Sequence, residues 1–160
     1  MDAHNEEQLI LDTIDRFLAR DVAPYARDLE LADEYPTEIV EKMKAIGLFG
    51  ATISEQYGGL GLNAGMYSKI VEKVAAVWMS VSGIFNSHLI MCAAIEKFGS
   101  EELKANYLPK LASGEMRGGI ALTEPDCGTD LQAIRTRADR DGVDYVINGT
   151  KQWITNSVKG

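Results

Sequence analysis

The chain has 160 residues, of which 46% are hydrophobic and 25% are charged, so it can bury the core of an ordinary globular domain and is neither disordered nor fibrous. Its formal net charge of -8 lacks the basic footprint that nucleic-acid binding requires, and we expect no nucleic-acid partner. Residues 1–41 hold twelve acidic residues against three arginines, whereas residues 131–160 hold five basic residues against three acidic ones. A phosphate-bearing ligand would therefore be attracted to the basic end.

Helical periodicity dominates the first part of the chain. Amphipathic helices are expected over residues 9–22, ending near Pro24, then over 25–32 and over 36–46. Gly47 is expected to stop the third of these helices. The stretch YGGLGL, Tyr57–Leu62, has three glycines in four residues and predicts a loop.

An uncharged run of 22 residues, Val74–Ile95, is long enough to suggest a membrane span. Its middle is polar, however, and would place serine, asparagine and histidine side chains at the bilayer centre. Two buried helices are therefore expected instead, over about 64–81 and 84–98 and joined near Ser82–Gly83, with no membrane span.

The two cysteines form no CxxC pair, and the two histidines are too isolated to complete a metal-ligand spacing. The sequence therefore predicts no metal site and two reduced thiols. The N-terminal sequence MDAHNEEQ is acidic, whereas a secretory signal needs a basic start and an apolar run. Together these features predict a cytoplasmic protein.

Strand periodicity replaces helical periodicity after Gly114. Val143, Tyr145 and Ile147 alternate with their neighbours, and the dipeptides Asp141–Gly142 and Asn148–Gly149 are typical of hairpin turns. A final strand is expected over residues 151–160. Two or three strands with free edges are only marginally stable, so the chain is expected to be the front part of a longer protein or to be completed by another chain.

The segment ALTEPDCGTD, Ala121–Asp130, combines strong backbone constraints with several polar groups. Pro125 fixes its own φ, while Gly128 allows conformations closed to other residues. The resulting bend can bring the hydroxyls of Thr123 and Thr129 to one ligand, as in an anion-binding loop. The same residue types also make ordinary turns, so both interpretations remain open.

A second segment, Trp153-Ile154-Thr155, follows the Asn148–Gly149 dipeptide. On a strand, alternation would place Trp153 and Thr155 on one face and Ile154 on the other. A large aromatic ring beside a hydroxyl suits a flat heteroaromatic ligand with a polar edge, although Trp153 can equally be a core residue.

Four stretches of this sequence together resemble the acyl-CoA dehydrogenase family. They are EQYGGLGL at Glu55–Leu62, KFGSEELKANYLPKLASGE at Lys97–Glu115, ALTEPDCGTDLQA at Ala121–Ala133 and YVINGTKQWITN at Tyr145–Asn156. The resemblance implies an α+β chain, with an all-α N-terminal helical domain at residues 1–115. It implies that residues 116–160 are the first strands of a β-barrel-like middle domain, and that the whole is part of a longer fold.

The resemblance also implies that FAD is the cofactor. The residues that match the family's flavin-contacting positions are Ile120, Ala121, Leu122, Thr123, Gly128, Thr129, Trp153, Ile154 and Thr155. By the same correspondence, Thr123 would bond the pyrimidine edge of the flavin, Thr155 would lie by N5, and Thr129 would also contact the acyl-CoA substrate. Donors fixed at the flavin edge would stabilise the charge that develops there as hydride is accepted.

The chain departs from the family's pattern in two ways. Cys127 stands where the signature expects Gly, Ala, Ser or Asn, and we interpret it as a steric filler rather than a nucleophile. The family's catalytic base comes from a C-terminal helical domain, so no catalytic residue is assigned in this segment. Glu124 is interpreted as a structural residue of the turn, and His88 as a satisfied core histidine.

The implied activity is the oxidation of an acyl-CoA thioester to the trans-2-enoyl-CoA. A base takes the α-proton, N5 of FAD takes the β-hydride, and an electron-transfer flavoprotein accepts the electrons. Family members are commonly homodimers or homotetramers. Two alternatives remain open: an acyl-CoA oxidase or related flavin monooxygenase that uses oxygen, and a non-catalytic helical module that does not hold FAD.

Overall fold

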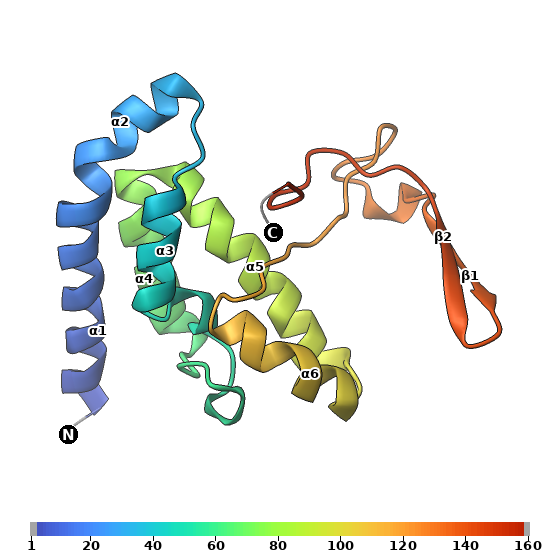
Figure 1. Cartoon of the computed structure of the whole chain (residues 1–160), viewed down its shortest axis with the longest axis horizontal. Helices are drawn as coiled ribbons and strands as arrows, with labels where there is room; N and C mark the ends of the chain where they lie inside the picture. Colours follow the sequence, from blue (N-terminus) through green and yellow to red (C-terminus); the bar gives the residue numbers. More distant parts are fainter. Residues whose placement is uncertain (1–2, 159–160) are drawn as a thin grey trace.

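A computed structural model describes residues 3–158 of the chain. Its α-helices are α1 (Ala3–Phe17), α2 (Ala23–Ala32), α3 (Thr37–Ala45), α4 (Ala64–Val77), α5 (Met79–Phe98) and α6 (Glu101–Ala112). The strands β1 (Arg137–Asp141) and β2 (Asp144–Asn148) pair in antiparallel fashion. Figure 1 shows the helices packed as one group, from which an extended connection crosses α5 and leads to a projecting hairpin. The expected α+β class, helices first and strands second, is confirmed.

The chain remains helical through the break predicted near Pro24. Leu18–Val22 form a π-helical turn that leads from α1 directly into α2. Pro24 lies in the first turn of α2, directly after Ala23, whose N–H donates to Leu18 O in the wider pattern of the π-helical turn. The proline therefore starts the second helix without requiring a loop before it.

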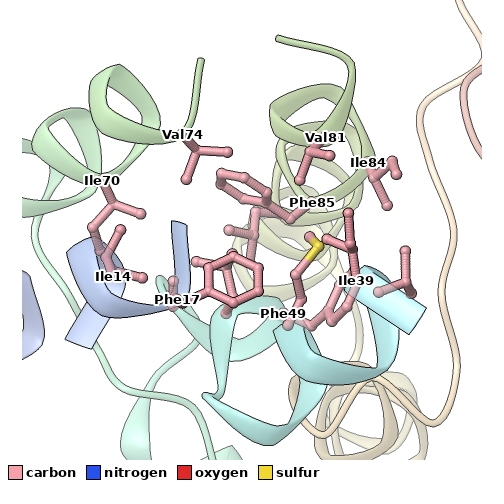
Figure 2. Close-up of a cluster of buried hydrophobic side chains, with 14 of the residues drawn as sticks. Ile14, Phe17, Ile39, Phe49, Ile70, Val74, Val81, Ile84 and Phe85 are labelled. Carbon is pink, nitrogen blue, oxygen red and sulfur yellow. The ribbon is translucent and has the colours of Figure 1, made fainter. Parts of the chain in front are cut away.

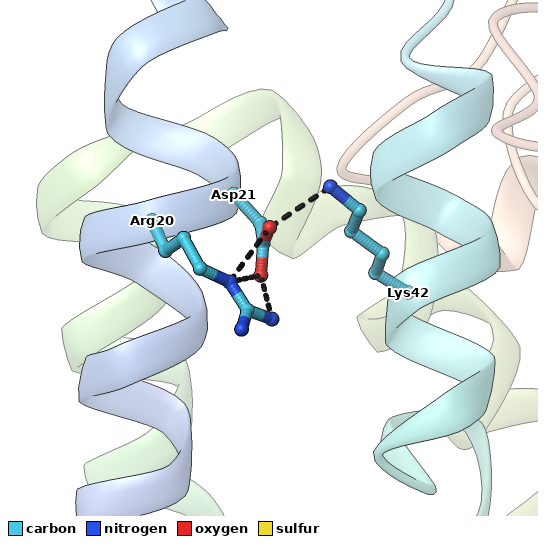
Figure 3. Close-up of polar contacts among 3 residues, drawn as sticks. All are labelled: Arg20, Asp21 and Lys42. Atoms are coloured by element: carbon cyan, nitrogen blue, oxygen red, sulfur yellow. Dashed lines mark hydrogen bonds and ion pairs between the residues drawn. The ribbon is translucent and has the colours of Figure 1, made fainter.

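A buried carboxylate ties this π-helical turn to α3. Asp21 is only 4% exposed, and its carboxylate accepts hydrogen bonds from Arg20 Nη2 at 2.8 Å and from Lys42 Nζ at 2.8 Å (Figure 3). These two bonds, that of Arg20 first, lower the pKa of Asp21 to about 2. Asp21 is therefore ionised at neutral pH, and it joins the α1–α2 junction to α3.

The hydrophobic core lies among α1, α3, α4 and α5, together with the turn at Leu48–Gly50 (Figure 2). The C-terminal end of α6 completes it with Leu108, Leu111 and Ala112. Its largest fully buried side chains are those of Phe49, Phe85, Met43, Leu48, Ile53, Ile70 and Leu108. Each such side chain stabilises the fold by about 1.5–3 kcal/mol relative to an exposed position. The amphipathic stripes expected from the sequence thus converge on one core.

The predicted junction between the two apolar helices is wrong. The break lies at Trp78, whose backbone is extended, whereas Ser82 and Gly83 lie inside α5. The Ser82 hydroxyl donates to Met79 O at 2.6 Å, which satisfies it within the helix. The Trp78 indole instead donates to Glu30 of α2, a tertiary contact that local sequence does not reveal. Between residues 3 and 158, no helix has the length and apolarity that crossing a bilayer requires.

The glycine-rich loop Tyr57–Leu62 forms as expected and is pinned to the core. Leu60 N donates to Gly50 O at 2.9 Å, and Leu62 N donates to Ala51 O at 2.9 Å. A Cβ atom at Gly59 would lie 2.0 Å from Ile53 O, so only glycine allows this approach. Gly47, with φ of 75°, follows the end of α3 as predicted.

The hairpin is confirmed at Asp141–Gly142 and wrong at Asn148–Gly149. Gly142 has φ of 62°, and the register pairs Arg137 with Asn148. All residues of both strands are exposed. Within the described part of the chain, no strand follows β2, which overturns the expected final strand over residues 151–158, while residues 159–160 lie outside the described part. Trp153 and Asn156 have φ of 59° and 67°, values that a strand excludes.

Candidate functional site

The segment Ala121–Asp130 forms a tight turn that directs its carboxylate and its thiol inward. Glu124 N donates to Cys127 O at 2.9 Å, and Cys127 N donates to Glu124 O at 3.2 Å. The residues between them, Pro125 and Asp126, are exposed, while Glu124 and Cys127 are buried. The interpretation of Cys127 as a small filler of this turn agrees with its burial.

Glu124 holds the turn against the chain that follows it. Its carboxylate accepts hydrogen bonds from Arg135 N at 2.8 Å, from Thr136 N at 2.9 Å and from Lys151 Nζ at 2.9 Å. Thr136, followed by the Arg135 amide and the Lys151 ammonium, lowers the pKa of Glu124 to about 2. A buried carboxylate that is fully engaged and strongly acidic is a structural group, as the sequence predicted, and a poor general base.

The depressed pKa of Glu124 makes the turn sensitive to acid. Because the pKa falls from an ordinary 4.5 to about 2 on folding, this carboxylate stabilises the fold above pH 4.5 and loses that contribution as the pH falls to about 2. Urea unfolding at several pH values should therefore show the unfolding free energy falling over this window. Glu124→Gln should reduce the fall, and Asp21 should account for part of the remainder. An equally steep fall in Glu124→Gln would contradict this role.

Lys151 and Gln152 bring the second segment against the first. Gln152 N donates to Thr123 O at 2.9 Å, and Lys151 Nζ donates to Leu122 O at 2.9 Å as well as to Glu124. The two segments singled out in the sequence are thus neighbours, although about thirty residues separate them along the chain. Sequence reasoning missed Lys151, because a lysine beside a motif gives no sign of which distant carboxylate it pairs with.

The residues predicted to contact the flavin are accessible to solvent, whereas Glu124 and Cys127, which hold the turn, are buried. Ala121, Leu122, Gly128, Thr129, Trp153 and Thr155 are exposed, and Ile120, Thr123 and Ile154 are half-buried. Trp153 is 82% exposed, so it is not the core residue of the open alternative. Trp153 also lies in a left-handed turn and not in a strand. The alternation that predicted one shared face for Trp153 and Thr155 is therefore absent. Hydroxyl groups, a glycine and an aromatic ring are therefore available to a flat, polar-edged ligand.

His88 is a core residue of α5 and contacts Gly118, in the connection that leads to this site. It is fully buried, its Nε2 is 3.1 Å from Leu111 O, and its ring meets that of Phe49 edge-on at 5.3 Å. Burial, as the largest cause, lowers the pKa of His88. The expectation of a satisfied core histidine is confirmed.

The comparisons with known proteins first define the class. The model of "Acyl-CoA dehydrogenase, N-terminal domain" matches residues 4–115, and that of "Acyl-CoA dehydrogenase, middle domain" matches residues 119–159. The first match alone covers well over half of the chain. This protein belongs to the acyl-CoA dehydrogenase family, as the four sequence stretches indicated.

Individual relatives agree with this assignment. The chain is 38% identical over 155 residues to (2S)-methylsuccinyl-CoA dehydrogenase of Cereibacter sphaeroides, covering 96% of this chain and 28% of that protein. A glutaryl-CoA dehydrogenase from Mycobacterium smegmatis, solved in complex with FADH2, is 32% identical with a TM-score of 0.88, covering 98% of this chain and 40% of that one. A chain in the structure of the electron transferring flavoprotein of Acidaminococcus fermentans is 32% identical with a TM-score of 0.89, covering 96% and 40%. The chain thus spans less than half the length of these relatives.

Proposed function

We propose that this chain supplies the N-terminal helical domain, residues 1–115, and the start of the middle domain, residues 116–160, of a cytoplasmic, homo-oligomeric FAD-dependent acyl-CoA dehydrogenase. The reaction is oxidation of an acyl-CoA thioester to the trans-2-enoyl-CoA, with electrons passed to an electron-transfer flavoprotein. The observation that carries the proposal is the hydrogen bond from Gln152 N to Thr123 O, which brings the two accessible segments next to each other. Family membership and the likeness to a relative solved with FADH2 support the choice of cofactor.

The nine accessible or half-buried residues described above would hold the flavin. FAD supplies the hydride acceptor for the β-carbon of the acyl chain. Thr123 and Thr155 would donate hydrogen bonds to the edge of the flavin ring, and the Trp153 ring would cover an apolar face of the flavin. Thr129 would contact the thioester. Glu124 already accepts three hydrogen bonds, so it is not available as the base that takes the α-proton.

Titration of FAD with the purified chain tests this proposal. We expect saturable quenching of flavin fluorescence, and no bleaching of the 450 nm band when acyl-CoA is added under anaerobic conditions, because the chain contributes no base. Riboflavin, which lacks the nucleotide half, serves as the comparison ligand. A folded chain that leaves the fluorescence of FAD unchanged would favour the non-catalytic helical module instead.

A further inference from the structure

The connection from α6 to the first flavin-contacting segment runs along one face of α5. A Cβ atom at Gly118 would lie 2.7 Å from Met91 Sδ, and one at Gly119 would lie 2.7 Å from Ser87 Oγ. The second flavin-contacting segment lies against Gly119 as well, because a Cβ at Gly119 would also lie 2.7 Å from Thr155 O. Glycine is therefore required at Gly119, where the close atom is a backbone oxygen, whereas a Cβ at Gly118 would only displace the flexible Met91 side chain.

His88 holds this connection from the helix side. Its Nε2 faces the carbonyl of Leu111, which can only accept, so Nε2 carries the proton. Its Nδ1 is then free to accept the bond that Gly118 N donates at 3.4 Å. A neutral ring with its proton on Nε2 satisfies these two contacts, in agreement with burial lowering the pKa of this histidine. The Cys92 thiol also lies 3.4 Å from Nε2, and the ring contacts the backbone of Phe49.

Asn156 holds the carbonyl of the same residue, Gly118. Its Nδ2 donates to Gly118 O at 3.0 Å and to Ile84 O, within α5, at 2.9 Å. The two hydrogens of one amide are thereby shared between the connection and the helix. Ile84 lies one helical turn before His88, so the contact of Asn156 with α5 and the contact of His88 with Gly118 are on the same face of α5. Asn156 also has the left-handed φ of 67° that asparagine tolerates better than most residues.

We propose that His88 and Asn156 are positioning residues that clamp the backbone of Gly118, one at its N–H and the other at its C=O, and so fix both flavin-contacting segments on α5. The first segment begins at Ile120, two residues after the clamp, and the second ends at Thr155, one residue before Asn156. The backbone of one residue, Gly118, therefore sets the position of both segments. The link to flavin rests on the proposed function, whereas the clamp itself does not.

Amide hydrogen exchange of the ¹⁵N-labelled chain tests the clamp. Asn156→Gly keeps the left-handed backbone accessible and removes the amide, and Asn156→Asp keeps the shape but turns a carboxylate toward two carbonyls. In both Asn156 variants the amide hydrogens of Gly118 and Gln152 should exchange about 30-fold faster, the ratio expected for two lost hydrogen bonds. Core amides such as that of Phe85 should stay protected. Asn106→Asp, on the exposed surface of α6, is the charge-matched control and should leave exchange unchanged.

Wild-type exchange rates at Gly118 and Gln152 in both Asn156 variants would overturn the clamp. The contact between His88 and Gly118 is tested by the ring ¹⁵N chemical shifts of His88 at pH 7. We expect a neutral ring with the proton on Nε2. A proton on Nδ1, or a charged ring, would overturn this part of the clamp. FAD titration is independent of these readouts. Asn156→Gly should bind FAD about 10-fold more weakly, and equal affinity would overturn the positioning role. A wild-type chain that binds no FAD would instead contradict the proposed function, and exchange would still decide the clamp.

Discussion

The variant Thr123→Ala/Trp153→Ala/Thr155→Ala is expected to bind FAD about 100-fold more weakly than the wild-type chain. Two hydroxyl hydrogen bonds of about 1 kcal/mol each and an aromatic contact of about 1 kcal/mol would be lost. The Trp153 side chain is 82% exposed, and neither threonine is buried, so the substitutions remove no core packing. Equilibrium fluorescence titration measures the affinity, and the unfolding free energy should change little.

The matched control removes the same kinds of group from the helical domain. Thr13→Ala/Tyr25→Ala deletes a half-buried hydroxyl on α1 and an exposed aromatic ring on α2, and it should keep wild-type affinity for FAD. Unchanged affinity in the triple variant, or an equal loss in the control, would show that the flavin does not bind through the two segments.

Phe49→Ala is expected to lower the unfolding free energy by about 4 kcal/mol, the usual result of deleting a large buried ring. Phe49 is fully buried, meets the His88 ring edge-on at 5.3 Å, and has the Arg117 guanidinium 5.8 Å from its ring centre. A Cβ at Gly114 would lie 3.0 Å from the same ring. The cavity would thus open where α5 meets the start of the connection to the site.

Urea unfolding at pH 7 measures this loss. Phe98→Ala is the matched control, because the same atoms are removed from a side chain that is 78% exposed at the end of α5, and it should change the unfolding free energy by less than about 0.5 kcal/mol. Losses of similar size in the two variants would mean that the turn at Leu48–Gly50 does not pack as described.

Local signals predicted most helix ends but not the central break. Gly47 follows the end of α3 and the glycine-rich stretch forms a loop, both as expected, because their backbone conformations are demanded locally. Ser82 and Gly83 misled because a helix interior tolerates both: the serine hydroxyl bonds back to Met79 O, and the Cβ position of Gly83 is open. At the real break Trp78 is paired with Glu30 of α2, and periodicity carries no information on such distant contacts.

The sequence predicted which residue types could form the site, but not how they are held. Thr123 and Trp153 were selected by their chemistry and by the family resemblance, and the structure brings their segments together through Gln152. The groups that hold the segments were missed. Lys151 and Asn156 act on carbonyls far away along the chain, and a strand was predicted where two left-handed residues make a turn. Single-sequence patterns do not encode such long-range pairing.

The central claim is that two segments form one flavin site. Its most direct test is a ¹H–¹⁵N correlation spectrum of the chain recorded during titration with FAD. Our account predicts that amides at residues 120–129 and at residues 152–156 shift together, with one common dissociation constant. Shifts in only one of the two segments, or different constants for each, would contradict it.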